Sequence, residues 1–352
     1  MELTMRWFGP QDPVELWKLR QVPNLNGVVT ALHQFAPGEA WTAGAMQALR
    51  EQVEATGLRI SVIESIPVHE DIKLGNSQRD HHIAAWIDSL RVVVSAGIRT
   101  VCYNFMPVFD WTRTDLAYKL PDGSTTLIFR QAEIEQLRIG EGDLSLPGWA
   151  EAFTAQQLTE LKTAYRSVDA AKLRENLVYF LQAVVPEAAR LGVRLAIHPD
   201  DPPWPVLGLP RVVSTADDLR FILNAVPNEH NGLTFCLGSL GSRADNDLSG
   251  MAEEFASRIH FVHARNVRRQ AEWDFDEVPH VSHFGSTNLA RVVMRLQQLR
   301  PEVPIRPDHG RMIWGETGRA GYGLYDRALG AMYLQGLMDA VDDPSADTKR
   351  WK

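Results

Sequence analysis

The chain's 352 residues, 45% hydrophobic and 23% charged, are typical of a globular protein, and 36 Lys and Arg against 44 Asp and Glu give a formal net charge of −8. That balance argues against binding to nucleic acid or to anionic membranes, because both need a clustered basic surface. Two cysteines, no signal-peptide pattern and no apolar run near the roughly 18 residues of a membrane span favour a cytoplasmic protein.

Short apolar runs alternate with longer amphipathic stretches along the chain. In order, the runs predict eight strands, at residues 3–8, 27–32, 59–64, 100–105, 194–198, 232–237, 260–265 and 303–308. The amphipathic stretches predict helices at 43–55, 79–96, 167–191, 214–226 and 321–341. Several strands are apolar on both faces, which is typical of parallel strands covered by helices.

This alternation predicts parallel strands joined by right-handed crossovers, and eight such units close most economically into a (β/α)₈ (TIM) barrel. We therefore interpret residues 1–352 as one α/β barrel domain. An open doubly wound sheet is the alternative. The chain has no G-x-G-x-x-G after an early strand and no P-loop motif, so we expect no nucleotide cofactor.

Residues 106–150 interrupt the alternation of strands and helices after the fourth predicted strand. They contain FDWTRTD, a KLPDG turn and EGDLSLPGW. A connection this long is usually a functional lid or an inserted subdomain, although it could also only brace the barrel. Because it begins at the carboxyl end of a strand, where barrel active sites form, we favour a lid.

Each of the last four predicted strands ends with a side chain that can bind a metal. These are His198 in AIHPDD, Cys236 in TFCLGS, His263 in FVHARN and Asp308 in IRPDHGR. In a closed barrel such strand ends meet at one mouth. Imidazole, thiolate and carboxylate together suit a divalent transition metal better than calcium or magnesium, so the pattern predicts one transition-metal site.

An anionic substrate would need local cations in a chain of negative net charge. Arg265, Arg311 and Arg113 could supply a bidentate carboxylate clamp. The other candidates for substrate contact are Asn266, Asn104 and Trp111.

Several long strings resemble the D-mannonate dehydratase family. They are SVIESIPVHEDIKLG, VCYNFMPVFDWTRTDLAYKLPDGS, HPDDPP, HARN, RPDHGR and GYGLYDRALGAMYLQGL. The resemblance runs from about Met5 to about Ala340, and its strings are far more specific than a short motif. Asn288 stands where the family pattern has an Asp, and the segment 268–281 is unusual, which leaves the detail of that loop open.

The resemblance implies a hydro-lyase that converts D-mannonate to 2-keto-3-deoxy-D-gluconate and water in hexuronate catabolism. It implies Mn²⁺ or Fe²⁺ on the four strand-end ligands, acid–base roles for His309 and Tyr322, and a homodimer or higher oligomer. Which of the two is the acid stays open. Neighbours in a regular strand face opposite ways, so His309 reaches the mouth only if the alternation breaks beside Asp308. A cation nearby can lower the pKa of a tyrosine.

Three alternatives remain from the residues. The first is a metal-dependent sugar isomerase or epimerase on the same barrel, although such sites usually carry more carboxylates and a lysine. The second is a sugar-acid binding protein without turnover, and the third is a set of polar strand ends that only satisfy one another. The preference among aldonic acid epimers also stays open.

Overall fold

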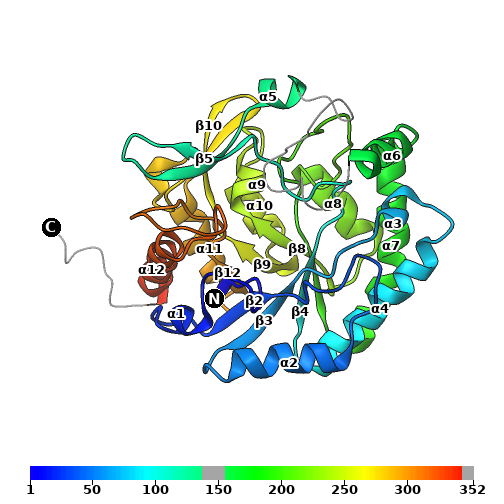
Figure 1. Cartoon of the computed structure of the whole chain (residues 1–352), viewed down its shortest axis with the longest axis horizontal. Helices are drawn as coiled ribbons and strands as arrows, with labels where there is room; N and C mark the ends of the chain where they lie inside the picture. The colour runs from blue at the N-terminus through cyan, green and yellow to red at the C-terminus, as the bar shows by residue number, and fades with distance from the viewer. Residues whose placement is uncertain (137–154, 343–352) are drawn as a thin grey trace.

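A closed barrel of eight parallel strands forms the centre of the computed structural model, which describes residues 1–136 and 155–342 (Figure 1). The barrel strands are β1 (Glu2–Arg6), β2 (Gly27–Thr30), β3 (Arg59–Glu64), β4 (Thr100–Tyr103), β7 (Arg194–Ile197), β8 (Asn231–Cys236), β9 (Ile259–His263) and β12 (Pro304–Arg306). Chain neighbours pair in parallel, and β12 closes the barrel against β1. The predicted barrel and its eight strands are confirmed, while most strands end earlier than predicted.

The strands are buried on both faces, as the apolar runs predicted. Every residue of β2, β4, β8 and β9 is buried. Val29, Val62, Cys102, Ala196 and Phe261, from five different strands, form a small cluster of their own, separate from the larger core. Since alternate residues of a strand face opposite ways, this cluster fills the barrel interior and the larger core lies between strands and helices.

Long helices cover the outside of the barrel (Figure 1). They are α2 (Ala43–Glu54), α4 (Arg79–Ser95), α7 (Ala170–Leu191), α8 (Ala216–Ala225), α11 (Leu289–Leu299) and α12 (Leu324–Asp342). Local signals set their ends: the Thr42 side chain accepts from the Ala45 amide, Thr215 and Asp218 form a capping box, and Gly192 ends α7 at φ 65°. Shorter helices are α1 (Leu16–Arg20), α3 (Glu70–Leu74), α5 (Gln131–Gln136), α6 (Ala155–Tyr165), α9 (Leu237–Gly241) and α10 (Leu248–Glu254), with 3₁₀ turns at Ala256–Arg258 and Ser282–Phe284.

A second, antiparallel sheet was not predicted. Its strands are β5 (Asp115–Lys119) and β6 (Thr125–Phe129), inserted after β4, and β10 (Asn266–Ala271) and β11 (Asp274–Val278), inserted after β9. The two hairpins join where Phe275 pairs with Phe129 and Asp276 with Ile128. Figure 1 shows β5 and β10 at the end of the barrel away from α2.

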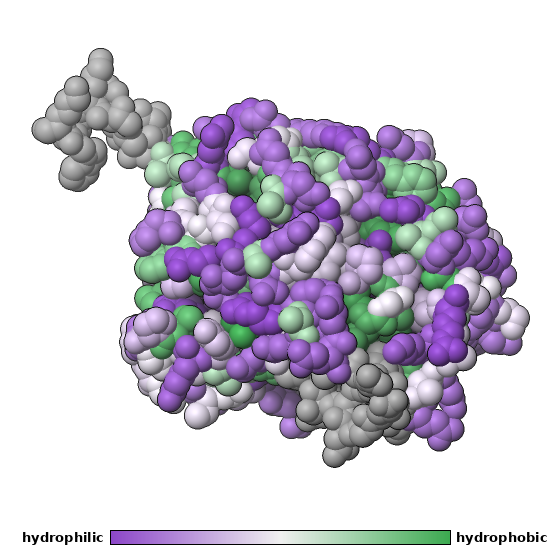
Figure 2. Space-filling view, turned by 90° about the horizontal axis from the view of Figure 1, so that it is seen from above, coloured by the Kyte–Doolittle hydropathy of each residue, from purple (hydrophilic) through white to green (hydrophobic). Residues whose placement is uncertain are grey.

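The predicted lid therefore contains a hairpin that is part of a sheet. Residues 137–150 of the predicted segment lie outside the described residues, and a closing function stays a prediction. Among the described residues, no helix combines the length and the apolar character needed to cross a bilayer. On the face seen in Figure 2, hydrophilic side chains predominate and the apolar patches are small and separate.

The interface of α7 with the barrel gives a test of the core. Leu177 is fully buried, so Leu177→Ala should lower the free energy of unfolding by about 2–5 kcal/mol through lost burial and the cavity left behind. Glu175→Ala, on the exposed face of the same helix, should change it by less than about 0.5 kcal/mol. Urea unfolding measures both, and equal effects would contradict this packing.

Candidate metal centre and active site

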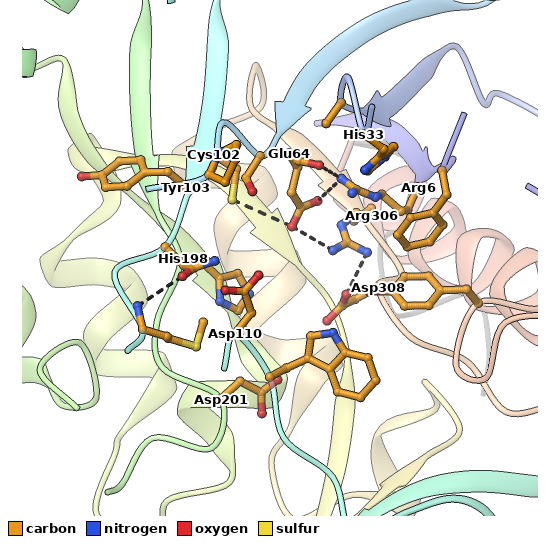
Figure 3. A pocket seen from close by; sticks show the side chains of 18 of the residues that line it. Arg6, His33, Glu64, Cys102, Tyr103, Asp110, His198, Asp201, Arg306 and Asp308 are labelled. Carbon is orange, nitrogen blue, oxygen red and sulfur yellow. Dashed lines mark hydrogen bonds and ion pairs between the residues drawn. The ribbon is translucent and has the colours of Figure 1, made fainter. Parts of the chain in front are cut away.

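A cavity of about 750 Å³ opens at the carboxyl ends of the barrel strands (Figure 3). We call it the mouth cavity. Residues at or just beyond the ends of β1, β3, β4, β7, β9 and β12 line it, among them Glu64, Asn104, His198, Arg265 and Asp308. Enzymes on this fold place their active sites at this end of the barrel, so the mouth cavity is the candidate active site.

The structure brings the four predicted metal ligands together. One ligand atom each from His198, Cys236 and His263 lies within 4.8 Å of the other two. Nε2 of His198 is 3.1 Å from Nδ1 of His263. Oδ2 of Asp308 is 3.9 Å from Sγ of Cys236 and 3.8 Å from Nδ1 of His263. His198, Cys236 and His263 can therefore reach one ion, and Asp308 lies within 4 Å of two of them.

The chemistry of this donor set fits a divalent transition metal. Nδ1 of His198 lies 2.6 Å from the Pro199 carbonyl oxygen, so Nδ1 carries a proton and Nε2 is the nitrogen that can bind an ion. The amide of Ser239, in the first turn of α9, donates to Sγ of Cys236 at 3.4 Å. Two neutral nitrogens, one thiolate and one carboxylate match the ligands and net charge that such an ion needs.

The backbone at Asp308 explains how two neighbours can face the cavity. Asp308 has φ 65°, in the left-handed region that non-glycine residues seldom adopt. Strand β12 has already ended at Arg306. The regular alternation is therefore broken, and both Asp308 and His309 line the mouth cavity.

Glu64 and Arg306 form a charged pair in the cavity lining, beside Asp308, that sequence reasoning missed (Figure 3). The Arg306 guanidinium lies 3.1 Å from Oε1 of Glu64 and 2.7 Å from Oδ1 of Asp308. Burial raises the pKa of the Glu64 carboxyl, but Arg306, His263 and Arg6 outweigh it and lower that pKa to about 2. For Asp308, Arg306 likewise outweighs burial, and the pKa lies well below its usual value. Both carboxylates are therefore ionised. The sequence signal that could have identified Glu64 and Arg306 as site residues is their position at the carboxyl ends of strands.

Four buried charges form a closed ring beside the ligands, which we call the charge ring: Arg113, Asp201, Arg265 and Glu277. Arg113 contacts Asp201 through two nitrogens, at 2.9 and 3.0 Å, and Glu277 at 2.6 Å. Arg265 contacts the same carboxylates at 2.7 and 3.2 Å. The ring is neutral, because each cation lies between both anions. Glu277 is on β11, in the sheet that was not predicted, so the sequence offered little sign of it.

His309 and Tyr322 lie in direct contact. Nε2 of His309 is 2.9 Å from the Tyr322 hydroxyl, and Nδ1 is 2.9 Å from Oε1 of Glu277. Burial raises the pKa of Tyr322 to about 12, although Arg306 and Arg6 act in the opposite direction. Burial therefore outweighs the nearby arginines, and among these protein groups the phenol keeps its proton at neutral pH.

The predicted substrate contacts divide into two groups. Asn104, Trp111 and Arg265 line the mouth cavity. Arg113, Arg311 and Asn266 do not appear in its lining: Arg113 is enclosed in the charge ring, and Arg311 pairs with Asp326 and Asp122. Asn266 donates to the carbonyls of Pro279 and Val281.

Arg319 lines the cavity but was not among the predicted residues. Its guanidinium lies 4.2 Å from the Phe8 ring centroid. The other cavity arginines, Arg6, Arg265 and Arg306, are paired with carboxylates. Within residues 1–136 and 155–342, Arg319 has no carboxylate partner.

Fold and site together define a (β/α)₈-barrel enzyme whose cavity combines a divalent-metal donor set with a histidine–tyrosine pair. A sequence model of the D-mannonate dehydratase (UxuA) family matches residues 1–348. A mannonate dehydratase of Streptococcus uberis is 49% identical over 344 residues, covering 97% of this chain and 99% of that protein. Mannonate dehydratase 2 of Halalkalibacterium halodurans is 47% identical, with 97% and 99% covered.

The crystal structure of mannonate dehydratase from Streptococcus suis serotype 2 superposes with a TM-score of 0.90 and 42% identity, covering 97% of this chain and 95% of that one. A xylose isomerase domain protein from Planctomyces limnophilus, 12% identical with a TM-score of 0.56, shares the fold alone. The chain belongs to the D-mannonate dehydratase family. The predicted family is confirmed, and a dehydratase is favoured over the isomerase and binding-protein alternatives.

Proposed function

We propose that this chain is a metal-dependent hydro-lyase that converts D-mannonate to 2-keto-3-deoxy-D-gluconate and water in hexuronate catabolism. One observation carries the proposal. A transition-metal donor set, of which His198 and Asp308 line the cavity, lies beside a histidine–tyrosine pair that lines the same cavity, in a chain nearly half identical to a mannonate dehydratase. The cavity volume of about 750 Å³ suits a six-carbon acid.

His198, Cys236, His263 and Asp308 would hold the ion, and the thiolate supports Mn²⁺ or Fe²⁺ over magnesium or calcium. When bound, such an ion acts as a Lewis acid that stabilises negative charge developing on the substrate's oxygens. The neutral charge ring and the paired Arg306 leave no large excess of positive charge among these residues to do the same.

His309 and Tyr322 would move the two protons that the elimination requires. With Nδ1 facing Glu277, Nε2 of His309 accepts a hydrogen bond from the Tyr322 hydroxyl and is the nitrogen that can take the proton from C2. Tyr322 holds its proton at neutral pH and can donate it as the C3–oxygen bond breaks, so that the hydroxyl leaves as water. The enol that remains takes up a proton at C3, loses the proton of its C2 hydroxyl and becomes the 2-keto acid. Histidine as base and tyrosine as acid is the assignment that these contacts favour.

The substrate's negative charge needs a cation that is not already neutralised. Arg113 and Arg265 are committed to the charge ring and Arg311 to Asp326 and Asp122. Arg319, stacked on Phe8, has its guanidinium available to the cavity. Phe8 packs edge-on against Tyr322, with 4.6 Å between ring centroids. We assign Arg319 to the substrate carboxylate, with Asn104 and Trp111 as further contacts.

A cytoplasmic location and a homodimer or higher oligomer complete the proposal. Cys102 and Cys236 are both free and buried, which suits a reducing compartment. The family resemblance is the support for the oligomer.

The reaction is tested by the wild type and His309→Asn. The wild type should release 2-keto acid from D-mannonate faster than from a panel of epimeric aldonic acids. His309→Asn should keep its metal but lose turnover by about 10²–10⁴-fold, because the base is gone. A keto-acid assay with elemental analysis measures both. No keto acid from the wild type would refute the function, and near-normal turnover of the variant would remove His309 from the reaction.

The metal ligands are tested by Cys236→Ser. Loss of the thiolate should lower the metal content of the purified protein by about tenfold under the same dialysis, by analogy with the affinity lost on smaller changes around metal sites. Cys102→Ser, in the barrel interior, should leave the metal content unchanged. Equal metal in Cys236→Ser and wild type would refute the ligand assignment.

Arg319→Gln tests substrate capture. Losing a charge-assisted contact of about 1.5–3 kcal/mol should raise KM for D-mannonate by roughly 10–100-fold. The turnover number kcat should change little, since Arg319 does not touch His309. The KM of Arg319→Lys should lie between those of the wild type and Arg319→Gln. Arg295→Gln, on the exposed face of α11, should have the KM of the wild type. An unchanged KM in Arg319→Gln would contradict this assignment.

A further inference from the structure

Glu277 is a buried carboxylate that three side chains share. Its Oε1 lies 2.6 Å from Arg113, 3.2 Å from Arg265 and 2.9 Å from Nδ1 of His309, while Oε2 is 3.0 Å from the same Nδ1. The residue is only 4% exposed. Since both carboxylate oxygens face the imidazole, the contact holds the ring on its Nδ1 side.

The backbone of Glu277 is fixed by both hairpins of the second sheet. Glu277 pairs with Val267 across β10 and β11. Its carbonyl accepts a hydrogen bond from the Thr126 hydroxyl on β6 at 2.8 Å. Phe275, two residues earlier, stacks on Phe129 of β6 with ring planes 9° apart. The side chain therefore enters the active site from a rigid platform.

The charge ring keeps the Glu277 carboxylate ionised and in place. Arg113 comes from the insertion after β4, Asp201 from beyond β7, and Arg265 from beyond β9. Each arginine lies between Glu277 and Asp201, so rotation of the Glu277 side chain would leave two buried cations short of a partner. Such an unpaired buried charge is strongly destabilising.

Resting on the proposed function, we propose that Glu277 is a positioning residue for proton transfer, which holds the His309 ring with Nδ1 against the carboxylate and Nε2 toward Tyr322. A carboxylate that fixes the tautomer and orientation of a catalytic histidine is a general device for acid–base work. The second sheet then has a catalytic purpose, because it brings Glu277 and Arg113 to the barrel mouth.

Asp276 offers a matched control on the same strand. It is also buried and acidic, but it pairs with Arg130 and Gln270, away from His309. Asp276→Asn and Glu277→Gln each remove one negative charge from neighbouring positions of β11. They differ in whether the lost carboxylate faces the proton-transfer pair.

A double-mutant cycle separates positioning from a merely structural role. Wild type, Glu277→Gln, His309→Asn and the double variant are loaded with metal, and kcat and KM for D-mannonate are measured per folded, metal-loaded chain. Glu277→Gln should lower kcat by about 10–100-fold and change KM by less than about threefold. In the His309→Asn background it should cost less than about twofold more, because its effect passes through His309. Glu277→Asp should recover part of the loss, and Asp276→Asn should stay within about twofold of the wild type.

Each outcome of the cycle either supports or refutes the positioning role of Glu277. Additive losses in the double variant, or a change confined to KM, would overturn the positioning role while leaving the dehydratase function intact. An effect of Asp276→Asn as large as that of Glu277→Gln would also overturn it. No turnover by the wild type would refute the proposed function and this inference with it. If Glu277→Gln folds poorly, Glu277→Asp alone and combined with His309→Asn completes the same cycle.

Discussion

The structure depends on compensating a dense group of buried charges at the mouth of the barrel. An isolated buried charge is unstable, so each must have a partner of opposite sign. Asp308 and Glu64 share Arg306, and Glu277 and Asp201 share Arg113 and Arg265. These pairings fix the side chains in single positions, which is the preorganisation that catalysis requires.

The same compensation separates the residues that support the site from those free to act. A guanidinium held between two carboxylates has little left to offer an anionic substrate. His309 and Tyr322 touch each other, and Arg319 stacks on an aromatic ring without an acidic partner among the described residues. Which residues support the site and which act on the substrate depends on which groups are already neutralised. Residue type alone does not show this difference.

The sequence predicted well what depends on local pattern and on topology. The eight barrel strands followed from apolar runs, and the meeting of His198, Cys236, His263 and Asp308 followed because parallel strands end at one mouth. The charge ring could not be predicted from the sequence. It joins segments far apart in the chain, and it depends on a sheet that neither hairpin indicates by itself. The left-handed backbone at Asp308 was equally hidden, although the need for such a break was clear.

The central claim is that one ion is held by two imidazoles, a thiolate and a carboxylate from four consecutive barrel strands. X-ray absorption at the edge of the metal bound to the purified protein tests it most directly. The account predicts one sulfur neighbour, with nitrogen or oxygen atoms completing the shell and multiple scattering from imidazole rings. A spectrum with only oxygen and nitrogen neighbours would contradict it.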